Sequence, residues 1–408
     1  MKILFTNIRL SSRSGTEIVI RDLASRLSER NHEVVVYTPT IGPIAAGVAS
    51  LGTTVVDNLL NVPFKPDIIH GHHTPCTAEA IIAFPDVPAI WVCHDAKSWF
   101  DQPPRFSQVR RLFAVDETCK ARLVEFEGIA ADQIEILPNA VDLRRFQDRP
   151  YPLPAKPARA LSLAKHSGLE TLLAEACRQT GLTFEAYGHG VGNPIEDIER
   201  RCANADIVFG TARTALEAMA AGAAAVLIDG RGFGGLVTSD NFALGRRLNF
   251  GLGMLGKQPK LEMLVEAIMA YDAKDAAEVS QRVRREANLD RTIERLENIY
   301  EVIVRENADR SFDQDNFRRQ KIEFSRTWLL NTEPAGPWLD EKNALLHHIT
   351  QLSNQAASLV ARNAEIEEQV AEKENSIRTL LSQIDRSERA RSVRLAKAIR
   401  RLFCWRPG

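Results

Sequence analysis

The chain has 408 residues, enough for two or three domains of about 150 residues each. Hydrophobic residues make up 44% and charged residues 26%, which excludes a disordered, collagen-like or disulfide-stapled protein. The net charge of −1 excludes a polyanion-binding surface spread over the whole chain. Residues 386–408 nevertheless contain eight Arg or Lys against one acidic residue, so this stretch is electrostatically distinct.

Cysteine usage and apolar runs indicate the compartment. The six cysteines are scattered, without a Cys-x-x-Cys pair or zinc-ligand spacing, so we expect reduced thiols in the cytoplasm. The first apolar run, residues 3–5, is too short for a signal peptide and is typical of a buried strand. The longest apolar run, residues 218–228, falls short of the about 20 residues that a membrane-spanning helix needs.

Short apolar runs alternate with helical patterns over the first 150 residues. The runs at 2–7 and 33–38 flank a stretch in which Ile18, Leu23 and Leu27 recur near helical spacing. Continuous apolar strands that alternate with helices indicate a parallel sheet covered on both faces. The other predicted strands of this series are 67–70, 89–94, 112–115 and 133–138.

A second series follows a linker that four prolines between 150 and 157 mark. Its predicted strands are 160–164, 183–187, 205–209 and 224–228, and residues 258–307 are predicted to be mainly helical. The sequence thus predicts an α/β protein with two Rossmann-like parallel-sheet domains, residues 1–150 and 151–312. We expect a ligand cleft between these domains and a linker at 313–340 after them.

Residues 341–385 contain a heptad repeat. Asn363 occupies a core position, where asparagine fixes the register of two strands, and Arg362 and Glu367 have the spacing of an interchain pair. These features predict a parallel homodimeric coiled coil, in which Lys373 is a defect. A single long helix that packs on its own domains is the alternative. The core positions hold Leu345, Leu352, Leu359, Ile366, Lys373 and Leu380, and Ile349, Ala356, Asn363, Val370, Ile377 and Ile384.

Residues 386–408 combine basic and apolar side chains. Leu395, Ile399 and Leu402 can share one helical face that arginines and a lysine flank, which predicts an interfacial helix on an anionic membrane surface. A solvated end that keeps the protein soluble is the alternative. One basic patch without a recognised motif argues against a nucleic-acid partner.

Residues 209–222 are the most informative stretch. A strand ends at Phe209, and Thr214 and Glu217 then have the spacing of a capping box at a helix start. Free amides and the helix dipole there favour an anion by about 0.3–1 kcal/mol per exposed interaction, which suits a phosphate. Arg213 and Lys165 could add positive charge. The alternative is that Glu217 caps its own helix and Arg213 is solvated.

Nicotinamide chemistry does not fit the first domain. The loop after the first strand, residues 8–15, lacks the three spaced glycines of a dinucleotide fold, and the strand at 33–38 does not end at an acid that could hold a ribose. A Walker loop is absent as well. The neighbouring His70, His72 and His73 favour turn or core positions over a metal site.

The sequence resembles glycosyltransferases of the GT-B fold and is most similar to glycosyltransferase family 4, whose members are retaining enzymes that use nucleotide-sugar donors. The resemblance runs through both predicted domains, and the last two of its motifs, in this order and at this distance, are the most specific. The motifs are Ser14-Gly15-Thr16-Glu17, Asn31-His32-Glu33-Val34, Pro66-Asp67-Ile68-Ile69-His70-Gly71-His72, Val92-Cys93-His94-Asp95, Leu137-Pro138-Asn139-Ala140-Val141-Asp142 and Leu216-Glu217-Ala218-Met219-Ala220-Ala221-Gly222.

The resemblance implies roles for individual residues. His94 would lie beside the transferred sugar, with a structural pair of His94 and Asp95 as the less favoured alternative, and Glu217 would hold the donor ribose. These two are the catalytic residues that the resemblance implies. The glycine turn that begins at Gly188 would face the nucleotide base or be only a tight turn. The donor-binding residues implied are Gly15, Lys165, Gly188, Gly190, Arg213, Thr214, Ala215, Leu216 and Glu217.

The resemblance also implies how the transfer would proceed. The leaving diphosphate would help to deprotonate the acceptor, so neither a protein nucleophile nor a metal would be needed, and electrostatic stabilisation of that leaving group would be the main contribution of the protein. No cofactor is implied beyond the nucleotide-diphosphate sugar, which is a co-substrate.

Three departures from the family pattern bear on activity. The family has a glutamate eight positions before the residue matched by Glu217, and here that position is Phe209, which cannot hydrogen-bond a sugar hydroxyl. The Arg and Lys pair after the first strand of the second domain is reduced to Lys165. Between Tyr187 and Ala205 the pattern has one strand and one helix fewer.

These features together predict a retaining glycosyltransferase that moves a sugar from a nucleotide-diphosphate sugar to a glycan or lipid-linked acceptor. We expect a role in bacterial surface polysaccharide synthesis, in the cytoplasm and at the inner face of its membrane. A glycosyltransferase-like scaffold without activity, which Phe209 favours, and a nucleotide-sugar epimerase are the alternatives.

Overall fold

The computed structural model of the chain describes residues 1–11, 15–163, 168–188, 197–330, 362–363, 366, 369–383, 386–389 and 391–401. Contacts divide the chain into two units, Met1–Phe324 and Ser325–Gly408, and both sheets belong to the first unit.

The first sheet has seven parallel strands in the order β3-β2-β1-β4-β5-β6-β7. The order reverses between β1 and β4, which leaves a crevice at the carboxyl ends of these strands. The strands are β1 (Lys2–Thr6), β2 (Glu33–Tyr37), β3 (Thr54–Val56), β4 (Ile68–His72), β5 (Ala89–Cys93), β6 (Val109–Ala114) and β7 (Ile134–Ile136). Its helical segments are α1 (Gly15–Glu29), α2 (Pro43–Ser50), η1 (Leu59–Asn61), α3 (Thr74–Ala83), η2 (Trp99–Asp101), α4 (Glu117–Glu125) and η3 (Ala131–Gln133).

The second sheet has five strands in the order β12-β11-β10-β8-β9, of which only β12 runs antiparallel. The strands are β8 (Arg159–Leu163), β9 (Thr183–Tyr187), β10 (Ile207–Gly210), β11 (Ala224–Asp229) and β12 (Gly232–Leu236). The helical segments are α5 (Glu170–Thr180), α6 (Ile198–Asn204), α7 (Arg213–Ala220), α8 (Phe242–Arg247), η5 (Leu252–Met254), α9 (Leu261–Met269) and α10 (Ala273–Glu286). The predicted α/β class with two parallel-sheet domains is therefore confirmed.

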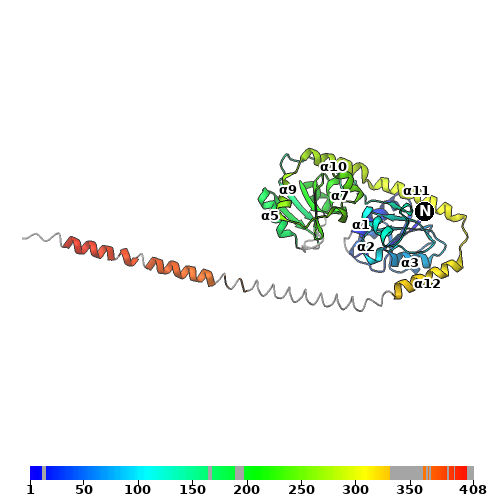
Figure 1. The fold of residues 1–408 in the computed structure, drawn as a ribbon, viewed down its shortest axis with the longest axis horizontal. Coiled ribbons are helices and arrows are strands. Elements are labelled where there is room, and N and C mark those ends of the chain that lie inside the picture. The colour runs from blue at the N-terminus through cyan, green and yellow to red at the C-terminus, as the bar shows by residue number, and fades with distance from the viewer. Residues whose placement is uncertain are drawn as a thin grey trace, which may run out of the picture. The chain divides into compact units, whose positions relative to one another are not determined.

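Apolar side chains on both faces of each sheet form the cores. In β5 all five residues are buried, and Trp91 is among the largest side chains without exposed surface. This fits continuous apolar strands between two helical layers. The helices of the first domain and of the second gather around separate sheets in Figure 1.

The chain returns to the first domain after α10. In α11 (Leu289–Ala308), Ile293, Leu296, Tyr300 and Ile303 belong to the core of the first sheet, because they recur on one face. The boundary predicted from the sequence, at residue 312, had instead placed this helix in the second domain. α12 (Gln314–Leu330) follows, and its Phe317 and Phe324 contact Phe106, with ring centroids 6.1 and 5.5 Å apart. Figure 1 shows α11 in yellow along the first domain.

Two segments cross between the domains and pair with each other. The amide of Val141 donates to the carbonyl of Ala287 over 2.7 Å, and the amide of Leu289 donates to the carbonyl of Val141 over 3.0 Å. Residues 147–157, the predicted proline-rich linker, contain no helix or strand.

A column of buried histidines crosses the first domain. The rings of His70 and His72 on β4 stack with centroids 4.6 Å apart, and Phe5 stacks on His70 at 4.5 Å. His70 Nδ1 contacts the hydroxyl of Tyr300, and His72 Nδ1 lies 2.6 Å from Nε2 of His94. Burial lowers the pKa of His70 to about 3 and that of His94 to about 4, so both rings are neutral near pH 7.

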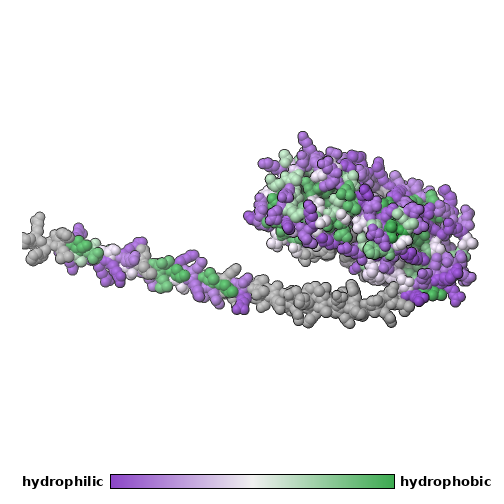
Figure 2. Space-filling model, in the orientation of Figure 1, coloured by the Kyte–Doolittle hydropathy of each residue, from purple (hydrophilic) through white to green (hydrophobic). Residues whose placement is uncertain are grey.

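In the second unit, residues 369–383 and 391–401 are helical. Their apolar side chains are exposed, and Figure 2 shows them as green patches between purple ones. Most of the predicted coiled coil before residue 369, and the end of the predicted tail after 401, lie outside the described residues. None of the described helices is both long enough and apolar enough to cross a membrane.

The histidine column predicts acid lability. The pKa values of the folded histidines lie below the ordinary value of about 6.5, so the unfolded chain binds more protons, and the free energy of unfolding falls as pH decreases below 6.5. Each such histidine contributes up to about 1.4 kcal/mol per pH unit. Urea unfolding followed by tryptophan fluorescence between pH 7 and 5 measures this slope.

A matched pair of variants isolates one histidine. His70→Phe with Tyr300→Phe removes both polar partners of a single contact, so the slope should decrease by the equivalent of about one proton. Tyr300→Phe alone should leave the slope unchanged. Equal slopes in the double variant and the wild type would contradict this account of the column.

Candidate functional site

A cleft of about 430 Å³ lies between the two domains of the first unit. Residues of the first domain reach it just after β4, β5 and β6, and residues of the second domain reach it just after β10 and β11. This is expected because the carboxyl ends of parallel strands meet at one edge of a sheet. The lining includes Gly15, Glu17, His73, His94, Asp95, Phe100, Asp101, Asp116, Ala212, Arg213, Arg231, Asn249 and Gly251.

His94, which the resemblance places beside the transferred sugar, lines this cleft at the end of β5. Its Nε2 faces His72, and its backbone amide donates to Oδ1 of Asp101 over 3.2 Å. Burial lowers the pKa of His94 to about 4, although the charge of Asp95 opposes the shift. The ring therefore offers a neutral hydrogen-bonding edge rather than a positive charge.

Asp101 is a cleft residue that sequence analysis missed. It ends η2 and is fully buried. Burial raises the pKa of its carboxyl group to about 7, and the nearby Asp95 adds to the shift, while the amide of His94 and the charge of Arg122 oppose it. No periodic pattern marks Asp101, but its place seven residues after His94 in the same loop was a usable signal.

The wall opposite His94 begins with the start of α7. No side chain caps this helix, and Ala212 before it has φ 50° and ψ −122°. Asn249 and Phe250 also have positive φ, at 52° and 49°, and the amide of Ala212 donates to the carbonyl of Phe250 over 2.7 Å. Three such residues cost about 1–3 kcal/mol each, and strain of this kind gathers at functional sites. An uncapped helix start facing a cleft suits an anion.

Arg213, the first residue of α7, joins the two domains. Its Nε donates to Oε1 of Glu217 over 2.7 Å, and its Nη2 donates to Oδ2 of Asp22 on α1. All three side chains are at most 8% exposed. Burial raises the pKa of Glu217, and the charge of Arg213 opposes that rise. Glu217, the residue predicted to hold the ribose, is therefore fixed through one oxygen by a buried arginine, and it is not among the residues that line the cleft.

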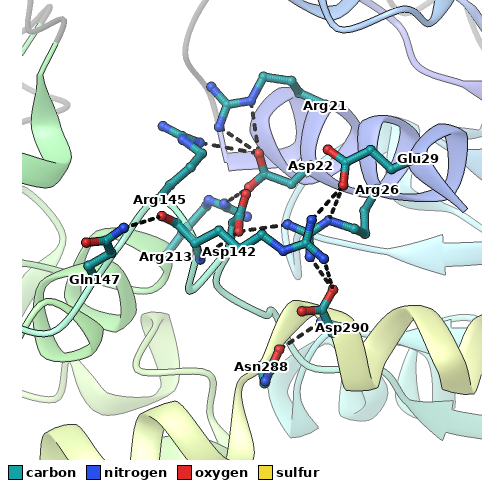
Figure 3. A network of polar contacts seen from close by, with 11 residues as sticks. Arg21, Asp22, Arg26, Glu29, Asp142, Arg145, Gln147, Arg213, Asn288 and Asp290 are labelled. Carbon is teal, nitrogen blue, oxygen red and sulfur yellow. Dashed lines mark hydrogen bonds and ion pairs between the residues drawn. The ribbon is translucent and has the colours of Figure 1, made fainter.

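Asp22 is the centre of a wider ionic network, which Figure 3 shows. Arg21 and Arg145 donate to its Oδ1 over 2.9 and 3.4 Å, while Arg213 takes the other oxygen. One turn further along α1, Arg26 donates to Asp142 over 2.9 Å and contacts Asp290. The network thus links α1 to α7 and to both segments that cross between the domains.

The remaining predicted site residues lie in different places. Gly15 lines the cleft, and nothing lies within 4 Å of where its Cβ would be. Thr214 lines a separate cavity of about 30 Å³ at the end of β10, whereas Ala215 and Leu216 are buried in the core. Gly188 follows the edge strand β9 with φ 125°. Lys165 and Gly190 lie outside the described residues.

Phe209 fills the position where the family has its first glutamate. It is 1% exposed, packs in the core of the second sheet with its ring 6.4 Å from that of Phe184, and also lines the small cavity with Thr214. An apolar ring therefore occupies the end of β10. Hydrogen bonding to a sugar at this point must come from other residues.

Two further cleft residues were not predicted from the sequence. Arg231 lines the cleft and contacts Asp229, with its Nη2 2.6 Å from Oδ2. That bond, together with the charge of Asp229, raises the pKa of Arg231 despite partial burial. Asn249 is 3% exposed, and its Oδ1 has no hydrogen-bond partner among the described residues. Both lie in loops without a recognisable pattern, so only the fold brings them to the cleft.

Comparisons with known proteins bear on the family and on the fold. Residues 13–145 match the profile of Glycosyltransferase Family 4, which supports the resemblance to that family over the first domain. None of the curated proteins matches the sequence.

Solved structures share the fold. HepE of Anabaena, solved in complex with UDP and glucose, is 15% identical with a TM-score of 0.54, and the match covers 74% of this chain and 100% of HepE. A glycosyltransferase of Rickettsia africae is 14% identical with a TM-score of 0.53, over 74% of this chain and 98% of that one. The predicted GT-B fold is thereby confirmed.

Proposed function

We propose that the protein is a glycosyltransferase that moves a sugar from a nucleotide-diphosphate donor to a glycan or lipid-linked acceptor, with retention and without a metal. The observation that carries the proposal is the cleft between the two domains, where the uncapped start of α7 faces His94. The family match of residues 13–145 and the GT-B fold support it. HepE was solved with UDP and glucose, which suggests the class of donor.

The two walls of the cleft suit the two substrates. The second domain contributes the α7 start, whose dipole favours a diphosphate, together with Arg213 and Arg231, which are paired with carboxylates. The first domain contributes neutral histidines together with carboxyl groups such as Asp101, which suit the hydroxyl groups of an acceptor. We assign the donor to the second domain and the acceptor to the first.

Glu217 would hold the donor ribose in this arrangement. Arg213 binds one of its oxygens, which fixes the direction of the carboxylate at the base of α7. Stabilisation of the leaving diphosphate by preorganised amides and charges would be the main contribution of the protein to the rate of transfer. The product would belong to bacterial surface polysaccharide synthesis, at the inner face of the cytoplasmic membrane.

A catalytically inactive scaffold is the second candidate, because Phe209 occupies the position of the first family glutamate and is buried among apolar side chains. Such a protein would act through its C-terminal helical residues. Nucleotide binding followed by turnover separates the two candidates.

Thermal unfolding with UDP, GDP, ADP, dTDP and their common sugars tests donor binding. One nucleotide at 100 times its dissociation constant should stabilise the wild type by about 2.7 kcal/mol. Glu217→Gln keeps the shape of the side chain and its bond to Arg213 but weakens the ribose contact, so its shift should be smaller.

Glu278→Gln is the matched control, because Glu278 is exposed on α10 and does not line the cleft. It should retain the full shift. A wild type that no nucleotide stabilises would count against the enzyme and favour the scaffold.

The C-terminal residues would dimerise the chain and hold it at a membrane. Val370, Ile377 and Leu380 are 51–57% exposed and occupy core positions of the heptad repeat, so a second copy of the chain would cover them. Further along, Leu395 and Ile399 are exposed beside basic residues, which favours an anionic lipid surface.

A truncation series separates the two roles. The full chain should be a dimer by light scattering and should sediment with vesicles that contain phosphatidylglycerol. A chain that ends at residue 385 should remain dimeric and lose the vesicles, and a chain that ends at 340 should be a monomer.

Two substitutions in the described helix sharpen the series. Ile377→Asp places a charge in the heptad core and should give monomers, whereas Thr379→Asp lies outside the core and should not. A full chain that is monomeric, or that sediments equally after truncation at 385, would contradict the corresponding role.

A further inference from the structure

The loop that follows β5 carries two neighbouring aromatic residues, Trp99 and Phe100, at the edge of the cleft. Phe100 lines the cleft, and its ring lies edge-on to that of His73, with centroids 4.6 Å apart. Trp99 is 56% exposed, and its ring meets that of Phe100 at 72°, with centroids 5.7 Å apart. A row of three aromatic rings therefore leads from the wall of the cleft to the surface of the first domain.

Polar side chains fix the backbone of this loop. Arg122 on α4 is buried and donates to the carbonyls of Asp95 and Ser98 over 3.3 and 2.9 Å. Arg122 also contacts the carbonyl of Asp101, whose carboxylate accepts the amide of His94 over 3.2 Å. Oδ1 of Asp95 accepts the amide of Ser98 over 3.1 Å. The aromatic rings on such a loop are positioned before a ligand arrives, which lowers the entropy cost of binding.

The stability of the fold does not explain the outward position of Trp99. A tryptophan that keeps more than half of its surface in water gains little from the hydrophobic effect, whereas Trp91 on β5 has no exposed surface. Single exposed apolar side chains are normal on protein surfaces, but Trp99 contacts a second aromatic ring that lines a cleft. Adjoining apolar surface at a cleft is typical of a ligand site.

The surroundings of the two rings favour a sugar over a lipid chain. A pyranose has faces of carbon-bound hydrogens that pack on an aromatic ring, and its hydroxyl groups need polar partners around that ring. A lipid chain would need a continuous apolar groove. The exposed residues of 94–102 other than Trp99 are polar, namely Asp95, Lys97 and Gln102.

We propose that Trp99 and Phe100 form a platform for a sugar ring of the acceptor. The inference rests on the proposed function and names the acceptor more closely. Trp99 is not among the residues that line the cleft, so a sugar ring on Trp99 lies outside the cleft. That ring is the second or a later unit of a glycan whose first unit enters the cleft beside Phe100. The acceptor therefore carries at least two sugar units.

Calorimetric titration of the full chain with maltotriose, cellotriose and chitotriose tests the platform. The three probes differ in linkage and substituents, and the measurement needs neither a donor nor turnover. At least one probe should bind, and Trp99→Ala should weaken that binding about 10- to 100-fold, because apolar contact with the indole ring is lost. Trp99→Phe keeps an aromatic face and should retain most of the affinity. Glucose, which has a single ring, should bind more weakly than the best of the three probes.

Tyr151→Ala is the matched control, because it removes an aromatic side chain that is 77% exposed and does not line the cleft. This variant should bind the saccharide as tightly as the wild type does. Equal affinity in Trp99→Ala and the wild type, or no binding of any of the three probes, overturns the platform. Binding of farnesyl phosphate that depends on Trp99, in place of saccharide binding, indicates a lipid occupant and overturns it as well.

Thermal unfolding of the same variants with nucleotides separates this inference from the proposed function. Each variant should unfold at the wild-type temperature and keep the wild-type nucleotide shift, because the substituted residues lie outside the second-domain wall of the cleft. A nucleotide shift without saccharide binding through Trp99 overturns the platform alone. Saccharide binding through Trp99 without any nucleotide shift overturns the proposed function and the acceptor role, and leaves the platform as a sugar-binding surface.

Discussion

A buried arginine between the two domains is the constraint on which the cleft depends. Arg213 begins α7 in the second domain and binds Asp22 on α1 of the first, with Glu217 on its other side. A buried ion pair adds little net stability, but removal of one partner costs about 3–5 kcal/mol because it leaves a charge unpaired. The ion pair of Arg213 and Asp22 therefore determines the relative orientation of the two domains more than the stability of each one. It also fixes the start of α7 and the carboxylate of Glu217, the proposed ribose contact, relative to the first domain.

The two walls of the cleft differ in their electrostatics. The second domain presents an uncapped helix start, and its arginines are paired, Arg213 with Asp22 and Glu217 and Arg231 with Asp229. The first domain keeps His70 and His94 neutral by burial and holds the Asp101 carboxyl group, whose charge changes near pH 7. The proposed diphosphate leaving group requires hydrogen-bond donors such as the amides of a helix start, and the proposed acceptor hydroxyl requires neutral or acidic groups that can accept its hydrogen bond. Because the walls belong to different domains, each substrate side is preorganised separately and the interface between the domains aligns them.

The sequence allowed the fold to be predicted well, because parallel strands between helical layers are continuous apolar runs, as in β5 and β11. The strand β12 was not predicted, because three of its five residues are glycine, a poor strand former. Gly234 is nevertheless required there, since a Cβ at this position would lie 2.9 Å from the carbonyl oxygen of Met254. The return of α11 to the first sheet could not be read from its helical pattern, since periodicity shows which face is buried but not the surface that covers it. Family motifs led to His94, Arg213 and Gly15 in the cleft wall. Arg231 and Asn249 reach it through loops whose geometry no sequence spacing indicates, and only its place seven residues after His94 pointed to Asp101.

The account as a whole requires that the cleft between the domains bind the donor. A crystal structure of the full chain with the nucleoside diphosphate that stabilises it tests this most directly. The account predicts diphosphate oxygens within hydrogen-bond distance of the backbone amides at the start of α7, ribose hydroxyls at Glu217, and open space beside His94 and Asp101. A nucleotide bound outside the cleft, or one within it that does not contact α7, would contradict the assignment of the donor to the second domain.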